Sequence, residues 1–81
     1  MKTITKAVAK ARKGLPKRLA EIRGDESQRA FARRLGVFQQ NINRYEHGVG
    51  PHLDFLIHLN QVERINLNWL LTGKGRIRVN S

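Results

Sequence analysis

The chain has 81 residues and a formal net charge of +10, from 16 lysines and arginines against six aspartates and glutamates. The length predicts one small domain, and the lack of cysteine excludes disulfides and thiolate metal or redox sites. The basic excess predicts a polyanionic partner, because each neutralised phosphate releases condensed counterions. No apolar run approaches the roughly 18 residues that a membrane span needs, so we expect a soluble, cytoplasmic protein.

The first 13 residues form a basic segment without any acidic residue. Its positive charges are Lys2, Lys6, Lys10, Arg12 and Lys13. Alanines between them favour a helix, but the apolar face is thin, so we expect a basic arm or a frayed helix. Gly14 interrupts this pattern, and Pro16 suits the first turn of a new helix. The expected boundary therefore separates the arm, residues 1–13, from a domain of residues 14–75.

The next pattern is a single apolar stripe at helical spacing. It consists of Leu15, Leu19 and Ile22. This spacing predicts a helix that ends within residues 24–26. Ser27 is a good N-cap, so a second helix is expected to begin at Gln28.

The segment from Gln28 to His47 has the pattern of two helices that pack against each other. The predicted inner faces are formed by Phe31, Ala32, Leu35, Val37, Ile42 and Tyr45. The small Ala32 suits the point where the helices cross, and Gly36 permits a tight turn between them. The outer positions are polar and long enough to reach a polyanionic partner. They are Gln39, Gln40, Asn43 and Arg44.

Two further helices and a tail complete the predicted fold. Residues 48–51 form a loop by composition, and a fourth helix is expected from about His52 to Gln61. Its predicted inward residues are Leu53, Leu56, Ile57 and Leu59, with Phe55 flanking them. Asn66 caps a last helix that Gly73 ends. The tail, residues 76–81, begins with four alternating residues and predicts at most a short strand. The fold class is all-α, with five short helices.

Five pieces of the sequence, in their order and spacing, carry a resemblance to a known family. They are Arg18-Leu19, Ser27-Gln28, Leu35-Gly36-Val37, the stretch from Ile42 to Gly48, and the stretch from Asn66 to Gly75. The chain from about Leu15 to Gly75 resembles the lambdoid phage repressor and Cro helix-turn-helix proteins. The resemblance implies a five-helix, repressor-type bundle whose third helix, about Phe38 to His47, enters the major groove of double-stranded DNA.

The resemblance also implies roles for the polar outer positions. In the family, the glutamine that opens the second helix bonds a DNA phosphate and steadies the first base-reading side chain, and Gln28 matches it. Gln39 and Gln40 match the base-reading start of the third helix, and a glutamine amide can bond both N6 and N7 of adenine. Asn43 is a candidate base reader, and Arg44 a candidate for a base or a phosphate. Solvent exposure alone is an equal alternative for these last two residues.

Basic residues outside the third helix are candidates for phosphate contacts. Arg29, Arg33 and Arg34 lie on the second helix, and we expect at least one of them to touch a phosphate. The alternative is a solvated charged face. Lys10 and Lys13 belong to the arm, which would add salt-dependent affinity without sequence preference. The alternative for the arm is a disordered, solubilising tail.

Three features leave alternatives open. Phe38 stands where relatives often have a serine or threonine cap, and it either touches a thymine methyl or packs against the domain or a partner. Arg23 and Glu46 resemble a family ion pair that ties the first helix to the third, and two exposed charges are an equal alternative. Trp69 resembles the core aromatic of the family, and we expect it to pack, with a dimer surface as one option.

The predicted function is a sequence-specific transcriptional regulator, a repressor that binds a palindromic operator as a homodimer. Candidate dimer surfaces are the last helix, Leu67 to Leu71, and the pair Ile77 and Val79. Many relatives add a C-terminal oligomerisation or self-cleavage domain, which does not fit in 81 residues. We therefore expect either a small standalone regulator or a fragment of a longer repressor.

Two other binding functions compete with this prediction. A protein-binding module, such as an antitoxin or adaptor, is favoured by an apolar Phe38 and opposed by the charge. A general RNA or nucleoid binder would show affinity without sequence preference. An enzyme is not predicted, because the sequence shows no nucleophile with a matching base and no phosphate-cradling loop. The three histidines lack metal-ligand spacing, so no metal, cofactor or small-molecule ligand is predicted.

Overall fold

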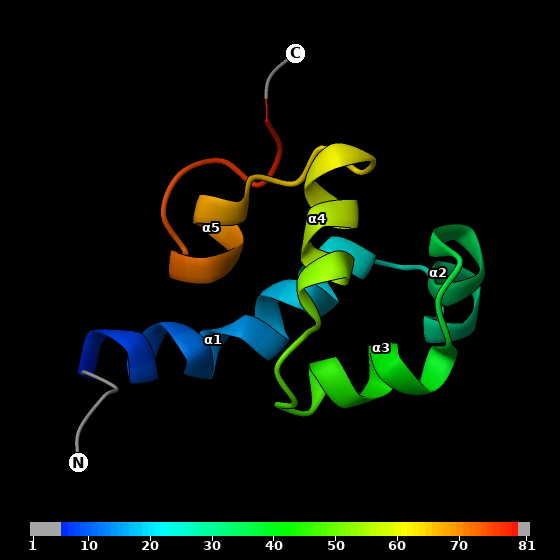
Figure 1. The fold of residues 1–81 in the computed structure, drawn as a ribbon, viewed down its shortest axis with the longest axis horizontal. Helices are drawn as coiled ribbons and strands as arrows, with labels where there is room; N and C mark the ends of the chain where they lie inside the picture. The colour runs from blue at the N-terminus through cyan, green and yellow to red at the C-terminus, as the bar shows by residue number, and fades with distance from the viewer. Residues whose placement is uncertain (1–5, 80–81) are drawn as a thin grey trace.

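A computed structural model describes residues 6–79, and residues 1–5 of the predicted arm and 80–81 of the predicted tail lie outside this range. Figure 1 shows the five α-helices, which are α1 (Lys6–Arg23), α2 (Gln28–Leu35), α3 (Gln39–Glu46), α4 (Leu53–Gln61) and α5 (Leu67–Thr72). The all-α prediction is confirmed. Within the described range, β pairing is limited to one antiparallel bridge between Ile65 and Arg78. No described helix is long and apolar enough to cross a membrane.

Helix α1 is one continuous helix, so the predicted break at Gly14 is wrong, as is a new helix starting at Pro16. The side chain of Arg18 joins the two halves. Its Nη2 donates to the carbonyl of Ala11 at 2.8 Å, and its Nε donates to the carbonyl of Leu70 in α5 at 2.6 Å. A Cβ at Gly14 would lie 2.5 Å from the Arg18 guanidinium, so the glycine makes room for this bracing side chain.

The helix-turn-helix unit follows its predicted boundaries. Ser27 caps α2, because its hydroxyl accepts a hydrogen bond from the backbone N–H of Ala30 at 3.0 Å. Gly36 ends α2 with a φ of 73°, a left-handed conformation that suits glycine. Phe38 occupies the N-cap position of α3 and provides no side-chain hydrogen bond there. Thus α2 has a polar cap, and α3 begins without one.

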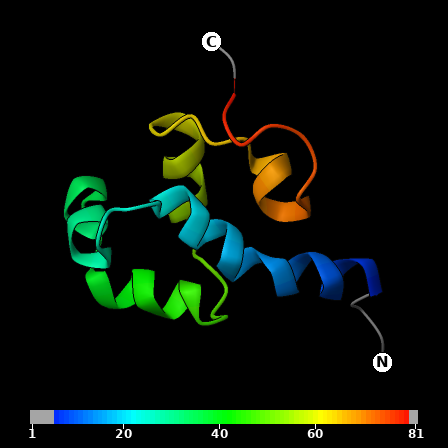
Figure 2. The same ribbon diagram turned by 180° about the vertical axis from the view of Figure 1, so that it is seen from behind.

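Helix α1 crosses the molecule between the other elements and contacts both α3 and α5 (Figure 2). The core is made of residues from all five helices and the segment before α5 that are at most 9% exposed. They are Leu15, Leu19, Ile22, Phe31, Ala32, Leu35, Ile42, Tyr45, Phe55, Leu59, Ile65, Trp69 and Leu70. The predicted inner faces of α1, α2 and α3 are confirmed by this set, with Val37 partly buried against it.

The predicted inner face of α4 is partly wrong. Leu53 and Ile57 are 69% and 46% exposed, whereas Phe55 and Leu59 are buried. Phe55 and Leu59 lie one helical turn apart on the same face, and the Phe55 ring contacts the ring of Tyr45 with centroids 4.9 Å apart. The aromatic contact is consistent with this rotation of α4, which the three consecutive apolar residues Phe55, Leu56 and Ile57 had concealed.

Residues 77–79 run back along the segment before α5. Asn66 caps α5, and its backbone N–H donates to the carbonyl of Ile77 at 2.7 Å. Gly73 ends the helix with a φ of 83°, as predicted. Trp69 is buried in the core, which confirms the expected packing role.

Candidate nucleic-acid interface

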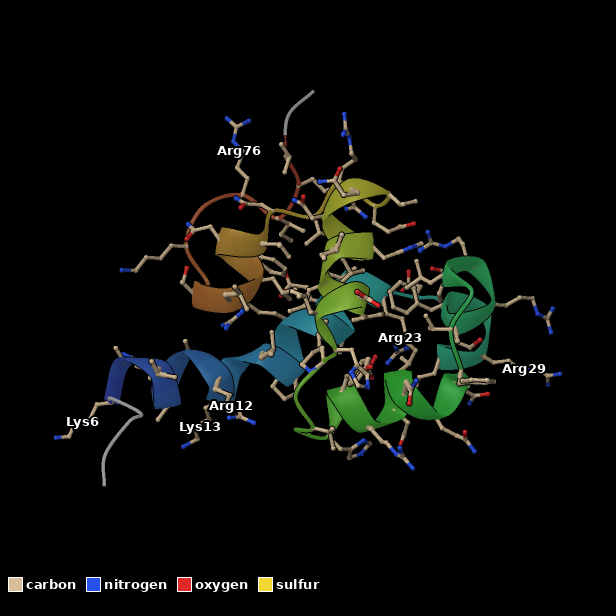
Figure 3. The ribbon with its side chains drawn as sticks, in the orientation of Figure 1. Lys6, Arg12, Lys13, Arg23, Arg29 and Arg76 are labelled. Carbon is tan, nitrogen blue, oxygen red and sulfur yellow. The ribbon has the colours of Figure 1, made fainter. Side chains whose placement is uncertain are left out.

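The outer face of α3 gathers the polar residues that the sequence singled out. All four are exposed, and together with the half-buried Gln28 of α2 they line one shallow, open hollow. These residues are Gln28, Gln39, Gln40, Asn43 and Arg44. The arrangement follows from helical spacing, because Ile42 and Tyr45 take the opposite face into the core. Figure 3 shows α3 along one edge of the molecule, with side chains extending away from the body.

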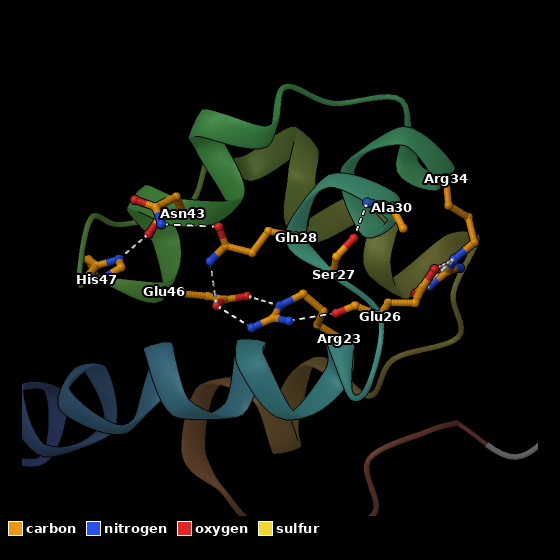
Figure 4. Close-up of polar contacts among 9 residues, drawn as sticks. All are labelled: Arg23, Glu26, Ser27, Gln28, Ala30, Arg34, Asn43, Glu46 and His47. Atoms are coloured by element: carbon orange, nitrogen blue, oxygen red, sulfur yellow. Dashed lines mark hydrogen bonds and ion pairs between the residues drawn. The ribbon is translucent and has the colours of Figure 1, made fainter.

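A chain of hydrogen bonds supports this hollow from below (Figure 4). Arg23 of α1 donates from Nε and Nη2 to the two carboxylate oxygens of Glu46, at 2.8 and 3.0 Å. Gln28 donates from Nε2 to Glu46 Oε1 at 3.0 Å. Asn43 donates from Nδ2 to Gln28 Oε1 at 3.2 Å. The expected ion pair between Arg23 and Glu46 is therefore present, and it connects α1 to two residues of the polar hollow.

The Glu46 carboxylate is held in its charged form. Burial alone would raise its pKa, because the Glu46 side chain is only 8% exposed. Hydrogen bonds from Arg23 and Gln28 outweigh that effect, with the charges of Arg23 and His47 adding to them, and they hold the Glu46 pKa below its ordinary value. The same hydrogen bond raises the pKa of the Arg23 guanidinium. The pair thus stays ionised at neutral pH.

The three arginines of α2 differ in their surroundings. Arg34 bonds two carboxylates, Glu26 at 2.8 Å and Glu63 at 2.6 Å, and these hydrogen bonds raise its pKa. Arg29 and Arg33 are exposed and form no ion pair with any residue in the range 6–79. None of the three lines the polar hollow.

The cations of α1 lie on the helix itself. Lys10 and Lys13 are exposed, and Figure 3 shows Arg12 and Lys13 extending to the same side of the molecule as the outer face of α3. Arg12 was named from the sequence as one of the arm's charges, but not as an individual phosphate contact. Its guanidinium reaches the loop after α3, where a Cβ at Gly50 would lie 3.5 Å from Nη2. Only its charge marked it in the sequence.

Phe38 is 75% exposed, so the alternative in which it packs against its own domain is wrong. It sits at the start of α3, next to Gln39, where most of its surface is open to contact from outside the domain. No group of three or more histidines, aspartates and glutamates among residues 6–79 could hold a metal ion.

Comparison with family models places this geometry in a known group. Residues 15–78 match the model of the bacteriophage CI repressor helix-turn-helix domain. The match covers well over half of the 81 residues and includes every residue of the polar hollow. The curated proteins and the solved structures contain no match to this chain. The chain therefore belongs to the bacteriophage CI repressor helix-turn-helix family of DNA-binding transcription regulators.

Proposed function

We propose that this protein is a sequence-specific repressor that inserts α3 into the major groove of an operator as a homodimer. One observation carries the proposal: five polar side chains from α2 and α3 line one exposed hollow, while the inner face of α3 is fixed in the core. A recognition helix needs this combination, because its base contacts depend on a rigid supporting helix.

The residues of the hollow have distinct proposed roles. Gln39 and Gln40 read bases from the first turn of α3, where a glutamine amide can bond adenine N6 and N7. Asn43 reads a base further along the helix, and Arg44 bonds a guanine or a phosphate. Gln28 uses its remaining Nε2 hydrogen for a DNA phosphate, since Glu46 takes the other one.

The proposed phosphate contacts lie on both sides of the hollow. Arg29 and Arg33 are the contacts on α2. Arg34 would first have to leave Glu26 or Glu63, so we assign it the weakest role of the three. Lys10 and Lys13 provide the contacts on α1. Dimerisation would place two copies of α3 about 34 Å apart, one turn of B-DNA, and exposed Leu71 and Val79 are candidate dimer contacts.

Selection from a random DNA pool tests base reading. Gln39→Ala and Gln40→Ala should each relax the preference at one operator position, at a cost of about 1–3 kcal/mol per lost bidentate contact. Gln61→Ala is the matched control, because Gln61 is exposed on α4 and, within residues 6–79, its side chain bonds only that of its neighbour Asn60. Selection profiles for both α3 variants that equal the control profile would overturn the assignment.

The salt dependence of binding tests the α1 cations. Each of Lys10→Gln and Lys13→Gln should make the negative slope of log K against log salt shallower by about 0.9. The preferred sequence should stay the same. Point substitution is better than truncation here, because Arg18 ties this part of α1 to α5. Arg76→Gln is the control, since Arg76 extends from the opposite side of the molecule in Figure 3. Slopes for the two α1 variants that equal the control slope would show that Lys10 and Lys13 do not contact DNA phosphates.

A second candidate function rests on Phe38, whose exposed ring suits a protein-binding module such as an antitoxin or adaptor. Phe38→Ser separates the two functions. It should stabilise the domain by about 1 kcal/mol in urea unfolding, because serine supplies the cap that α3 lacks. A repressor carrying this change should lose at most a thymine preference, whereas a protein-binding module should lose its partner. An unstabilised variant would contradict the cap argument.

A further inference from the structure

The hydrogen-bond chain beneath the hollow has a direction. It starts at a carboxylate, Glu46, which is fixed by two donors from Arg23. It then passes through Gln28 to Asn43, which is exposed on the outer face of α3. Ionised Glu46 differs from the other members of this hydrogen-bond chain, because its carboxylate oxygens can accept hydrogen bonds but cannot donate them. Its charge therefore decides how the two amides that follow must be turned.

Each amide has one accepting end and one donating end. Since ionised Glu46 can only accept, Gln28 must turn its Nε2 toward it, which leaves Gln28 Oε1 facing Asn43. That oxygen also only accepts, so Asn43 must turn its Nδ2 inward. Figure 4 shows this arrangement, with the nitrogen of Asn43 toward Gln28. The carbonyl oxygen of Asn43 is then left for a ligand, together with the second Nδ2 hydrogen.

We propose that Glu46 and Gln28 are positioning residues that fix the amide orientation of Asn43 and thereby make it select adenine over guanine. The inference rests on the proposed function and adds to it the identity of one base. The family role of the glutamine that opens the second helix is to steady the first base-reading side chain. In this chain, the partner of Gln28 is Asn43, one turn further along α3.

Adenine fits the orientation that the chain of hydrogen bonds imposes. Its major-groove edge offers the N6 donor to Asn43 Oδ1 and the N7 acceptor to the second Nδ2 hydrogen. Guanine offers two acceptors, N7 and O6, and its O6 would face the Asn43 oxygen. An asparagine that could rotate freely would turn its nitrogen outward and accept guanine as well. The fixed amide thus excludes guanine by placing two acceptors against each other.

Selection from a random DNA pool, run on the full chain and on variants, tests this proposal. Asn43→Ala identifies the operator position that Asn43 reads, as the position whose preference disappears. The wild type should enrich adenine over guanine there by about tenfold. Gln28→Met keeps the length of the side chain and removes both hydrogen bonds, so this ratio should approach one. The preferences at the positions of Gln39 and Gln40 should stay unchanged.

Two further variants complete the test. Gln61→Met is the matched control, because it makes the same change at an exposed glutamine of α4, and it should keep the wild-type ratio. Glu46→Gln replaces the carboxylate with an amide that can face Gln28 either way. The ratio of adenine to guanine at the Asn43 position should therefore approach one, as in Gln28→Met. Glu46→Gln provides the test if Gln28→Met fails to fold. Urea unfolding of each variant separates loss of orientation from loss of fold.

Two outcomes would overturn the inference while the proposed function stands. The first is a Gln28→Met protein that still prefers adenine at the Asn43 position. The second is a Gln28→Met protein whose preference changes at the Gln39 position instead. A wild-type protein that enriches no sequence would overturn the proposed function and this inference together.

Discussion

Replacing Ile42 with alanine should destabilise the domain by about 2–5 kcal/mol, the usual cost of emptying a fully buried aliphatic site. Ile42 is 2% exposed and is the inner anchor of α3. Ile42 lines a small internal gap together with Leu19 of α1 and Phe31 of α2. Its side chain therefore packs where α3 meets both of these helices. For a domain of this size, such a loss approaches the whole free energy of unfolding. Urea unfolding followed by far-ultraviolet circular dichroism measures it.

Ile57→Ala is the matched control for this prediction. It removes the same atoms from a helical isoleucine that is 46% exposed, and the expected loss is about 0.5 kcal/mol or less. DNA binding should follow stability in Ile42→Ala and remain near that of the wild type in Ile57→Ala. Equal destabilisation by the two substitutions would show that the inner face of α3 does not hold the domain together.

The sequence predicted those parts of the fold that depend on local chemistry. Ser27, Gly36, Asn66 and Gly73 mark helix ends through their own side chains or backbone freedom, and all four ends were predicted correctly. Helical spacing likewise identified the inner face of α3. These features needed no knowledge of distant residues.

Two of the errors, at Gly14 and on α4, came from contacts between distant residues. Gly14 looked like a helix break until the Arg18 side chain crossed it to reach Leu70, 52 residues away. The rotation of α4 depended on a ring contact between Phe55 and Tyr45. Neither contact leaves a periodic signal in the sequence, because each joins elements whose relative placement is set by packing.

The same distinction applies to the candidate site. The polar outer face of α3 followed from spacing and from the family resemblance. The resemblance also gave the pairing of Arg23 with Glu46, which the structure confirms. The link from Gln28 to Asn43 could not be read from either, since the family pattern directs this glutamine to the first reading residue. The link depends on how far the two side chains reach between α2 and α3, where Asn43 Nδ2 lies 3.2 Å from Gln28 Oε1.

Stability should fall as the solution is acidified below about pH 4.5, and protonation of Glu46 should contribute to the fall. Its pKa is lower in the folded protein than the ordinary value of 4.5, so the unfolded chain binds more protons in this window. The stabilisation by Glu46 is therefore complete above the unfolded pKa and is lost as pH falls through the folded pKa. A hydrogen bond from Arg34 lowers the pKa of Glu26 as well, so Glu26 contributes in the same direction.

Glu46→Gln tests this link between the ion pair and acid stability. At pH 7 the substitution should cost about 2–4 kcal/mol, below the full cost of breaking a buried pair because Arg23 is 21% exposed and water can solvate it. Below pH 4.5 the variant should lose stability less steeply than the wild type, since it has one fewer carboxylate to protonate. Urea unfolding between pH 3 and pH 7, at roughly half-unit steps, follows both effects.

Glu21→Gln provides the control, because Glu21 is an exposed carboxylate of α1 that forms no ion pair within residues 6–79. Its stability profile should superimpose on that of the wild type. If Glu46→Gln also superimposes on the wild type, the ion pair contributes nothing to folding. Arg23 and Glu46 would then matter only for the orientation of the reading surface, which the operator selections measure independently of stability.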